Sequence, residues 1–264
     1  MTTTTLDPHA TAAQTTAAQT TETGSRENTQ SFDAAAYTRS ALSSRQALAA
    51  VIDHTLLKPE ATREQVLKVA QEAAEYKFAC AMVNPSWVAT TYAALAGTGV
   101  PVGVVVGFPL GANLTTTKRD EAAALVRLGA RELDMVINIG LLKSGDNARI
   151  EKDIRAVVGV GHEAGAIVKV ILETCLLSTE EKLRASEIAC TAGADFLKTS
   201  TGFSTGGATA ADVALLRGVA GSRCGVKASG GIRTLADARA MLEAGACRIG
   251  ASASVAIVQA LPSI

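Results

Sequence analysis

The sequence predicts an α/β fold, a single (β/α)8 TIM barrel that follows a disordered N-terminal tail and one extra N-terminal helix. Short apolar or β-branched runs alternate with longer amphipathic stretches, a pattern that indicates a parallel sheet covered by helices. The alternation comprises eight strand-helix units in about 215 residues, which suits a closed barrel. An open doubly wound sheet is the alternative, and it usually has fewer strands.

Residues 1–30 contain mainly Thr, Ala and Gln, with almost no apolar side chains to bury. This composition predicts a disordered tail. A transit peptide is a weaker interpretation, because Asp7, Glu22 and Glu27 are acidic and arginine is scarce. The segment 32–51 has helical spacing and predicts the extra helix. We therefore divide the chain into a tail, residues 1–30, and a barrel domain, residues 31–264, that includes this helix.

Eight units follow, each a run of strand-forming residues and a stretch with helical periodicity. The first four are "AVIDHT" with residues 62–76, "FACAMV" with 85–97, "VGVVVGF" with 115–128, and "ELDMVIN" with 147–164. The last four are "IVKVILET" with 179–192, "DFLKTS" with 209–219, "GVKAS" with 234–244, and "CRIGAS" with 252–260. The strand runs are largely apolar, as expected for parallel strands that are buried on both faces.

Charge and composition exclude several classes of partner. The chain contains 25 Lys plus Arg and 25 Asp plus Glu, so its charges balance. It therefore has neither the excess of basic residues typical of nucleic-acid binding nor an acidic tail that would attract a basic partner. No apolar run of about 18 residues could span a bilayer, and the N-terminus lacks the features of a secretory signal. We expect a cytoplasmic protein that binds a small neutral or anionic molecule, without a nucleic-acid or membrane partner.

The cysteines and histidines argue against a metal centre. Five cysteines are widely spaced and form no CxxC motif, so we expect reduced thiols. Only three histidines are present, too few to favour a three-ligand catalytic metal site. We interpret His54 as a structural hydrogen-bonding residue, and Met82 and Met135 as core. The chemistry should therefore be organic, without a metal or another cofactor.

Polar residues gather at the predicted C-terminal ends of the strands, where the active site of a (β/α)8 barrel lies. These residues are Asp53, Thr55, Asn84, Asp134, Asn138, Lys169, Glu173, Lys198, Thr199, Ser200, Lys227, Ser229 and Ser252. Three of them are lysines from consecutive strands, and Asp134 lies on the strand before. We expect this group to form the reactive centre.

Lys198 has the features of a nucleophile. It ends a short apolar run and precedes a loop of small residues, and Lys227 lies on the adjacent strand. Burial and a neighbouring cation both lower the pKa of a lysine, which yields a neutral amine that can attack a carbonyl. Asp134 could then move protons between the intermediates. The alternative is that these lysines only form salt bridges, as Asp53 and Lys169 could do while they orient the site.

Glycines after the last two strands predict an anion site. Gly230 and Gly231 follow the seventh strand, and Gly250 precedes a short helix that we expect to begin near Ser252. Barrels often bind phosphate through backbone N–H groups at this place. Arg233 is the nearest possible charged partner.

Several longer motifs follow one another in order and cover the chain from residue 51 to about residue 258: "IDHTLLKP", "VGFPLGAN", "ELDMVINIG", "KVILETCLL", "FLKTSTGFSTGGAT" and "VKASGGIRT". Together these motifs resemble deoxyribose-phosphate aldolases. The resemblance implies a class I aldolase that cleaves 2-deoxy-D-ribose 5-phosphate reversibly to acetaldehyde and D-glyceraldehyde 3-phosphate, without metal. It also implies a role in deoxyribose phosphate catabolism and, as a family expectation, a homodimer.

The resemblance assigns roles to the residues that match its motifs. Lys198 in "KTSTG" would form the Schiff base, Asp134 in "DMVIN" would shuttle protons, and Lys227 in "VKASGG" would assist. Asp53 and Lys169 match further polar positions of the family's site. The expected substrate-binding residues are Asp53, Thr55, Lys169, Thr199, Gly202, Gly230, Gly231, Arg233, Gly250 and Ser252.

Two positions depart from the family's pattern. Many members carry cysteine where this chain has Met82, so a thiol that reactive aldehydes can trap should be missing here. The family commonly has two adjacent serines after the eighth strand, whereas Ser252 is followed by Ala253. Phosphate contacts should then depend more on backbone donors.

Two other functions remain open. A different lysine-dependent barrel enzyme, such as a transaldolase-like or keto-acid aldolase, would share the imine chemistry but should use other strands and motifs. A non-catalytic barrel that binds a sugar phosphate is the second, and the presence of Lys198, Lys227 and Asp134 argues against it.

Overall fold

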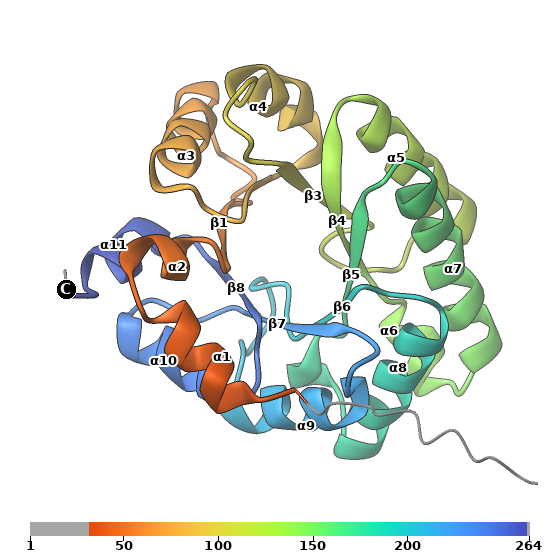
Figure 1. Cartoon of the computed structure of the whole chain (residues 1–264). Coiled ribbons are helices and arrows are strands. Elements are labelled where there is room, and N and C mark those ends of the chain that lie inside the picture. Colours follow the sequence, from red (N-terminus) through yellow and green to blue (C-terminus); the bar gives the residue numbers. More distant parts are fainter. Residues whose placement is uncertain (1–31, 263–264) are drawn as a thin grey trace, which may run out of the picture. The chain divides into compact units, whose positions relative to one another are not determined.

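The computed structural model describes residues 32–262, in which eight parallel strands close into a barrel (Figure 1). Each strand pairs with the next along the chain, and β8 pairs with β1. The strands are β1 (Ile52–Leu56), β2 (Cys80–Val83), β3 (Val102–Val106), β4 (Ala130–Val136), β5 (Ile167–Ile171), β6 (Phe196–Lys198), β7 (Gly225–Ser229) and β8 (Arg248–Ala251). The predicted (β/α)8 barrel is confirmed, and the predicted tail, residues 1–30, lies outside the described residues.

Helices surround the barrel and follow the strands in turn (Figure 1). The helices that follow the strands are α3 (Arg63–Tyr76), α4 (Val88–Ala94), α5 (Thr115–Arg127), α7 (Asn147–Glu163), α8 (Thr179–Thr191), α9 (Ala210–Ala220), α10 (Leu235–Glu243) and α11 (Ser254–Gln259). Among the described residues, α6 (Ile139–Lys143) and the 3-10 turn η2 (Thr174–Leu176) lie where no helix was predicted, whereas the 3-10 turn η1 (Pro85–Trp87) forms the start of the predicted helical stretch 85–97. Within residues 32–262 no helix has the length and apolar character needed to cross a membrane.

The predicted single N-terminal helix is wrong in one respect, because the segment forms two helices. These are α1 (Ala34–Ala41) and α2 (Arg45–Ala49). Ser44 lies between them in extended conformation, and its hydroxyl accepts the N–H of Ala47, so it starts a new helix instead of continuing the first. The Tyr37 hydroxyl on α1 donates to the backbone oxygen of Cys247, just before β8, at 2.7 Å.

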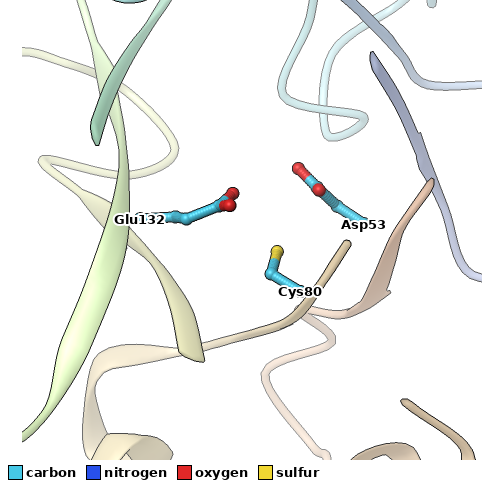
Figure 2. A group of neighbouring side chains, drawn as sticks. All are labelled: Asp53, Cys80 and Glu132. Carbon is cyan, nitrogen blue, oxygen red and sulfur yellow. The ribbon is translucent and has the colours of Figure 1, made fainter. Parts of the chain in front are cut away.

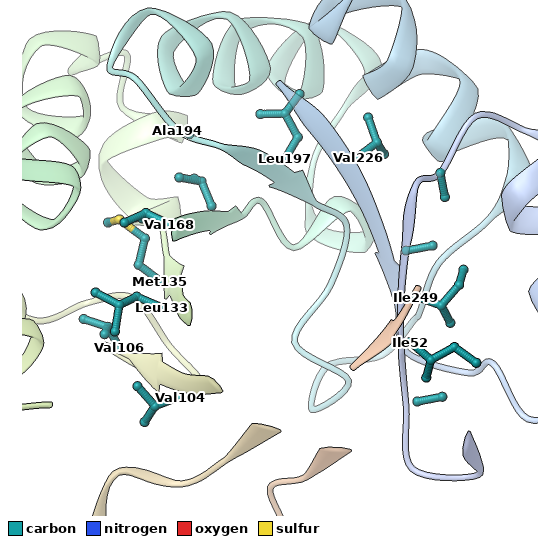
Figure 3. Packing of buried hydrophobic residues seen from close by; sticks show 14 of the residues in the cluster. Ile52, Val104, Val106, Leu133, Met135, Val168, Ala194, Leu197, Val226 and Ile249 are labelled. Carbon is teal, nitrogen blue, oxygen red and sulfur yellow. The ribbon is translucent and has the colours of Figure 1, made fainter. Parts of the chain in front are cut away.

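The main hydrophobic core lies between the barrel and its helices. Figure 3 shows side chains of this core on the outer face of the strands, among them Ile52, Val104, Leu133, Val168 and Val226. Each of these five is at most 2% exposed. Successive strand residues point to opposite faces, so the same strands present their other residues to the barrel interior.

A buried ion pair lies outside the barrel, between α5 and α7. Lys118 Nζ donates to Asp153 Oδ2 at 2.5 Å and to the backbone oxygen of Val136, at the end of β4, at 2.8 Å. Lys118 also lies directly under Gly107, where an added Cβ would be 2.8 Å from Lys118 Cε. The pair therefore supports the turn after β3, next to the C-terminal ends of β3 and β4.

We expect Lys118→Met to lower the free energy of unfolding by about 3–5 kcal/mol, because it leaves Asp153 charged and unpaired in the interior. The double variant Lys118→Met/Asp153→Leu should recover most of this loss, since an apolar pair of similar volume removes the unpaired charge. Urea unfolding measures both, with Lys152→Met, an exposed lysine of α7, as the control. A loss below about 1 kcal/mol for Lys118→Met would show that the pair is not needed for stability.

Candidate active site

Lys198 ends β6 and places its amine inside the barrel. The residue is only 2% exposed, and its backbone partner on β7 is Lys227. The amine Nζ donates to Asp134 Oδ2 at 2.7 Å. The structure thus brings together the three residues that strand-end placement had singled out.

Asp134 accepts hydrogen bonds from three lysines. Its Oδ2 accepts from Lys198 and Lys227, each at 2.7 Å, and its Oδ1 accepts from Lys169 at 2.8 Å. Lys227 also donates to Asp53 Oδ2 at 2.5 Å, and Lys169 Nζ lies 3.5 Å from that same oxygen. Asp53 and Lys169 are therefore members of one network and do not form an isolated pair.

Two charged residues that the sequence analysis missed complete this network. Glu132 Oε2 lies 2.6 Å from Lys169 Nζ, and Arg248 Nη1 donates to Asp53 Oδ1 at 2.7 Å. Glu132 precedes Asp134 by two residues on β4, so both side chains point into the barrel. Extending the strand alternation toward the N-terminal halves of β4 and β8 would have found both.

The network holds one more cation than it holds carboxylates. The cations are Lys169, Lys198, Lys227 and Arg248, and the carboxylates are Asp53, Glu132 and Asp134. An excess buried charge is costly, so one amine should lose its proton more easily than the others. Within residues 32–262, Lys198 has one carboxylate partner, whereas Lys227 has two and Lys169 has three.

The pKa values follow this difference in partners. Burial lowers the pKa of the Lys198 amine to about 8, with Asp134 opposing and Lys227 reinforcing the change. Burial also acts to lower the pKa of Lys227 and Lys169, but their carboxylate neighbours outweigh it and raise both. With a pKa near 8, roughly one Lys198 amine in ten is neutral at pH 7.

Asp134 remains ionised although it is fully buried. Burial alone would favour the neutral acid, but Lys169, Lys198 and Lys227 outweigh it and hold the pKa of Asp134 well below its usual range. Because this ionised carboxylate is hydrogen-bonded to two amines at equal distance, it can relay a proton from one amine to the other.

The interior wall formed by β2 and β3 is apolar. The buried cluster there comprises Leu57, Cys80, Met82 and Val105, with Phe108 packed against it. Met82 lies over Gly103, where an added Cβ would be 2.5 Å from Met82 Cε. Met82 was predicted to be core. It is buried, but it lines the barrel interior and not the space under the helices.

Asp53, Cys80 and Glu132 point toward one another inside the barrel (Figure 2), and their potential ligand atoms lie within 4.8 Å of one another. The carboxylates already accept from Lys169, Lys227 and Arg248. Burial and the adjacent carboxylates raise the pKa of the Cys80 thiol well above its usual value, whereas a metal requires the thiolate. These donors therefore fit an ion-pair network better than a cation site.

Glu173 holds the loop that follows Lys198. Its carboxylate accepts the backbone N–H of Thr201 at 3.2 Å and also the Thr201 hydroxyl. The backbone N–H of Thr174 donates to the oxygen of Thr199 at 2.9 Å. The start of the β6–α9 loop is thereby tied to the end of β5. The sequence had marked Glu173 only as a polar strand-end residue.

The loops after β6 and β7 contact each other through glycines. The N–H of Ala208 donates to Gly230 O at 3.0 Å, and a Cβ added at Gly207 would lie 2.3 Å from that oxygen. The Cα of Gly202 lies 3.5 Å from where a Cβ of Gly230 would be. Gly231 has φ of +81°, is exposed, and has open space where a Cβ would point. Gly230 is thus required for packing, while Gly231 lies on the surface of the loop.

Gly250 lies inside β8 and not in the loop that was expected to bind an anion. A Cβ at this position would lie 2.3 Å from Ser229 Oγ and 3.0 Å from Lys227 Cε. Glycine therefore leaves the room through which Lys227 reaches Asp134. Ser252 is exposed after β8, and α11 begins at Ser254, slightly later than expected.

The other predicted residues have varied surroundings. Arg233 is exposed before α10, and its backbone N–H donates to Asp237. The Thr55 hydroxyl donates to Asp53 O at 2.8 Å. The Thr199 hydroxyl donates to Ser229 O and accepts the Ser229 N–H, so it joins β6 to β7. His54 Nε2 contacts Glu72 of α3 at 2.8 Å, outside the barrel, in agreement with a structural role.

Comparison with known proteins relates the whole barrel to aldolases. The profile of the DeoC/LacD family of aldolases matches residues 47–260. Deoxyribose-phosphate aldolases of Bacillus mycoides and Bacillus cytotoxicus are each 59% identical over 211 residues, which is 80% of this chain and 94% of theirs. The tetrameric deoxyribose phosphate aldolase structure from Aeropyrum pernix is 36% identical with a TM-score of 0.80, covering 86% of this chain and 96% of that one.

Replacing Lys227 tests the charge balance of the network. Lys227 helps to lower the pKa of Lys198, so Lys227→Met should raise that pKa above about 8 and shift reactivity to higher pH. Reductive methylation of Lys198 with formaldehyde and cyanoborohydride, followed across pH by peptide mass spectrometry, reports the neutral fraction of the amine. Lys152→Met should leave unchanged the pH at which methylation of Lys198 is half-maximal, which is the midpoint of this profile. A midpoint that stays or falls in Lys227→Met would show that Lys227 is not a charged neighbour of Lys198.

Proposed function

Because the chain belongs to the DeoC/LacD family of aldolases, we propose that it cleaves 2-deoxy-D-ribose 5-phosphate reversibly through an imine on Lys198. The products are acetaldehyde and D-glyceraldehyde 3-phosphate. The observation that carries this proposal is the environment of the Lys198 amine, which has a pKa of about 8 and shares Asp134 Oδ2 with Lys227. The closely related deoxyribose-phosphate aldolases support the choice of substrate.

The neutral amine of Lys198 attacks the aldehyde carbon of the open-chain sugar, and loss of water from the carbinolamine gives an imine. When the proton of the C3 hydroxyl is removed, the C2–C3 bond breaks and C3 becomes the aldehyde carbon of D-glyceraldehyde 3-phosphate, which leaves. The electron pair of the broken bond forms the C1–C2 double bond of the enamine. Protonation at C2 and hydrolysis release acetaldehyde and restore the amine. Each step moves a proton close to Lys198, and Asp134 and Lys227 lie where they can supply or accept it.

Asp53 and Lys169 act by holding these groups in position. Asp53 binds the Lys227 amine, and Lys169 binds the second oxygen of Asp134. Both residues are fully buried, so the direction of the Asp134 carboxylate is set before substrate arrives.

The phosphate group would lie at the loops after β7 and β8, with Gly230 and Gly231 allowing close approach of the backbone. The exposed positions of Gly231, Arg233 and Ser252 support this placement. Thr55, Thr199 and Gly202 lie at the ends of β1 and β6 and would contribute to the same side of the site.

We also propose that the protein works as a cytoplasmic homodimer on this small-molecule substrate. The five cysteines are free thiols, in agreement with a reducing compartment. Light scattering after gel filtration separates a dimer from a tetramer such as the Aeropyrum pernix relative.

The imine can be trapped. Borohydride in the presence of acetaldehyde should add one ethyl group to the peptide that contains Lys198, because reduction fixes the imine carbon on the amine. Peptide mass spectrometry locates it. Lys198→Met should show no adduct and no turnover, while Lys152→Met, an exposed lysine, should behave as the parent protein. An adduct on Lys227 instead would overturn the assignment, and no adduct at all would favour a barrel that only binds sugar phosphates.

The proposed phosphate-binding site can be tested by comparing phosphorylated and unphosphorylated substrates. Gly231→Val should lower kcat/KM for deoxyribose 5-phosphate at least about 10-fold, and affect unphosphorylated deoxyribose little, because a side chain is added where the anion must approach. Gly99→Val is the matched control, since Gly99 has a similar φ of +78°, equally open surroundings, and lies before β3 at the opposite end of the barrel. Equal losses on both substrates would show that Gly231 serves folding and not anion binding.

A further inference from the structure

Two cysteines lie side by side at the end of the barrel opposite to Lys198. Cys190 is in the last turn of α8, and Cys224 directly precedes β7. Their sulfur atoms are 2.9 Å apart, in hydrogen-bond contact. A disulfide bond has a length of about 2.05 Å, so a small side-chain movement would join them.

A second contact clamps the same two segments together. Arg223, next to Cys224, donates from Nη1 and Nη2 to the two carboxylate oxygens of Glu187, each at 2.7 Å. Glu187 lies three residues before Cys190 and therefore on the same face of α8. The backbone oxygen of Cys224 also accepts from Arg217 at 3.2 Å. The two sulfur atoms are thus held near each other by contacts that do not involve sulfur.

The two thiols differ in exposure and acidity. Cys190 is partly exposed, whereas Cys224 is 8% exposed. The hydrogen bond with Cys224 lowers the pKa of the Cys190 thiol, and the Arg223 guanidinium acts in the same direction. The same hydrogen bond and burial raise the pKa of Cys224. Cys190 should therefore be the first to react with an oxidant, since the thiolate is the reactive form.

We propose that Cys190 and Cys224 form a peroxide-sensitive dithiol site that closes to a disulfide. The Cys190 thiolate attacks hydrogen peroxide, the O–O bond breaks, and a sulfenic acid and hydroxide form. The sulfur of Cys224 then attacks the sulfur of Cys190, the S–O bond breaks, and its oxygen leaves as water with the Cys224 proton. The two thiols lose two electrons in total, and peroxide is reduced to water.

The disulfide would close a ring with a sequence separation of 34 residues. This ring contains β6, with Lys198 at its end, and all of α9. Restricting that segment in the unfolded chain should raise the melting temperature by roughly 5 to 15 °C. Aldolase turnover should not change, because the pair lies at the other end of the strands from Lys198.

The experiment treats the full chain with hydrogen peroxide, removes the excess with catalase, alkylates the remaining thiols and maps the peptides by mass spectrometry. The expected product is a peptide pair joined through Cys190 and Cys224 that dithiothreitol separates again. Oxidised protein should melt above reduced protein. Cross-links that involve Cys247 or Cys175 instead, or stable oxygen adducts on Cys190 without a disulfide, would overturn the proposal.

Variants assign the order of the steps. Cys224→Ser should leave the sulfenic acid on Cys190, where dimedone captures it, whereas Cys190→Ser should leave Cys224 as a thiol. Cys247→Ser is the matched control, because Cys247 lies near the same strands and should not affect disulfide formation. Both Cys190→Ser and Cys224→Ser should lose the difference in melting temperature between treated and untreated protein. Dimedone labelling of Cys224 in Cys190→Ser would show that the order is reversed.

Discussion

Asp134 accepts hydrogen bonds from Lys169, Lys198 and Lys227, and the polar interior of the barrel depends on this carboxylate. Three amines gathered in a buried space would repel one another, and a buried charge without a partner typically costs several kcal/mol. Asp134 removes most of that cost, but it cannot supply all three amines with a carboxylate of their own. Among the residues that the structure describes, Lys198 has no carboxylate partner besides Asp134, and it is therefore the amine with the lowered pKa. Stability and reactivity thus arise from the same unequal distribution of charge.

The strands keep this charged interior separate from the hydrophobic core. Because side chains alternate along a strand, Leu133 and Val168 pack under the helices while Asp134 and Lys169 point into the barrel. The hydrophobic core that stabilises the fold is therefore separate from the site residues named above. The interior itself is divided, since β2 and β3 contribute an apolar wall with Met82 at its centre. A carbonyl substrate would meet charged groups on one side and apolar groups on the other.

Much of the fold could be predicted from the sequence, because the periodicity that predicts each strand and helix lies within a short segment of the chain. Eight strand-helix units follow from periodicity, and the closed barrel confirms them. The errors occurred where local signals compete. The N-terminal segment has continuous helical spacing, but the Ser44 hydroxyl caps a new helix and divides the segment in two. The short helix α6 was hidden in the connection after β4, where Asn138 caps it by accepting the N–H of Leu141.

The sequence by itself determined which residues reach the strand ends, and so identified Lys198, Asp134 and Lys227 as one group. Only the tertiary structure decided why the pKa of Lys198 is lowered while that of Lys169 and Lys227 is raised. The reason is that Glu132 and Asp53, on strands far apart in the chain, lie beside those two amines, whereas Lys198 contacts Asp134 alone among the described carboxylates. The tertiary structure also decided that a glycine of β8 leaves room for a lysine of β7, and that Cys190 lies against Cys224. Charge interactions and steric contacts depend on separation in space, which periodicity along one strand does not contain.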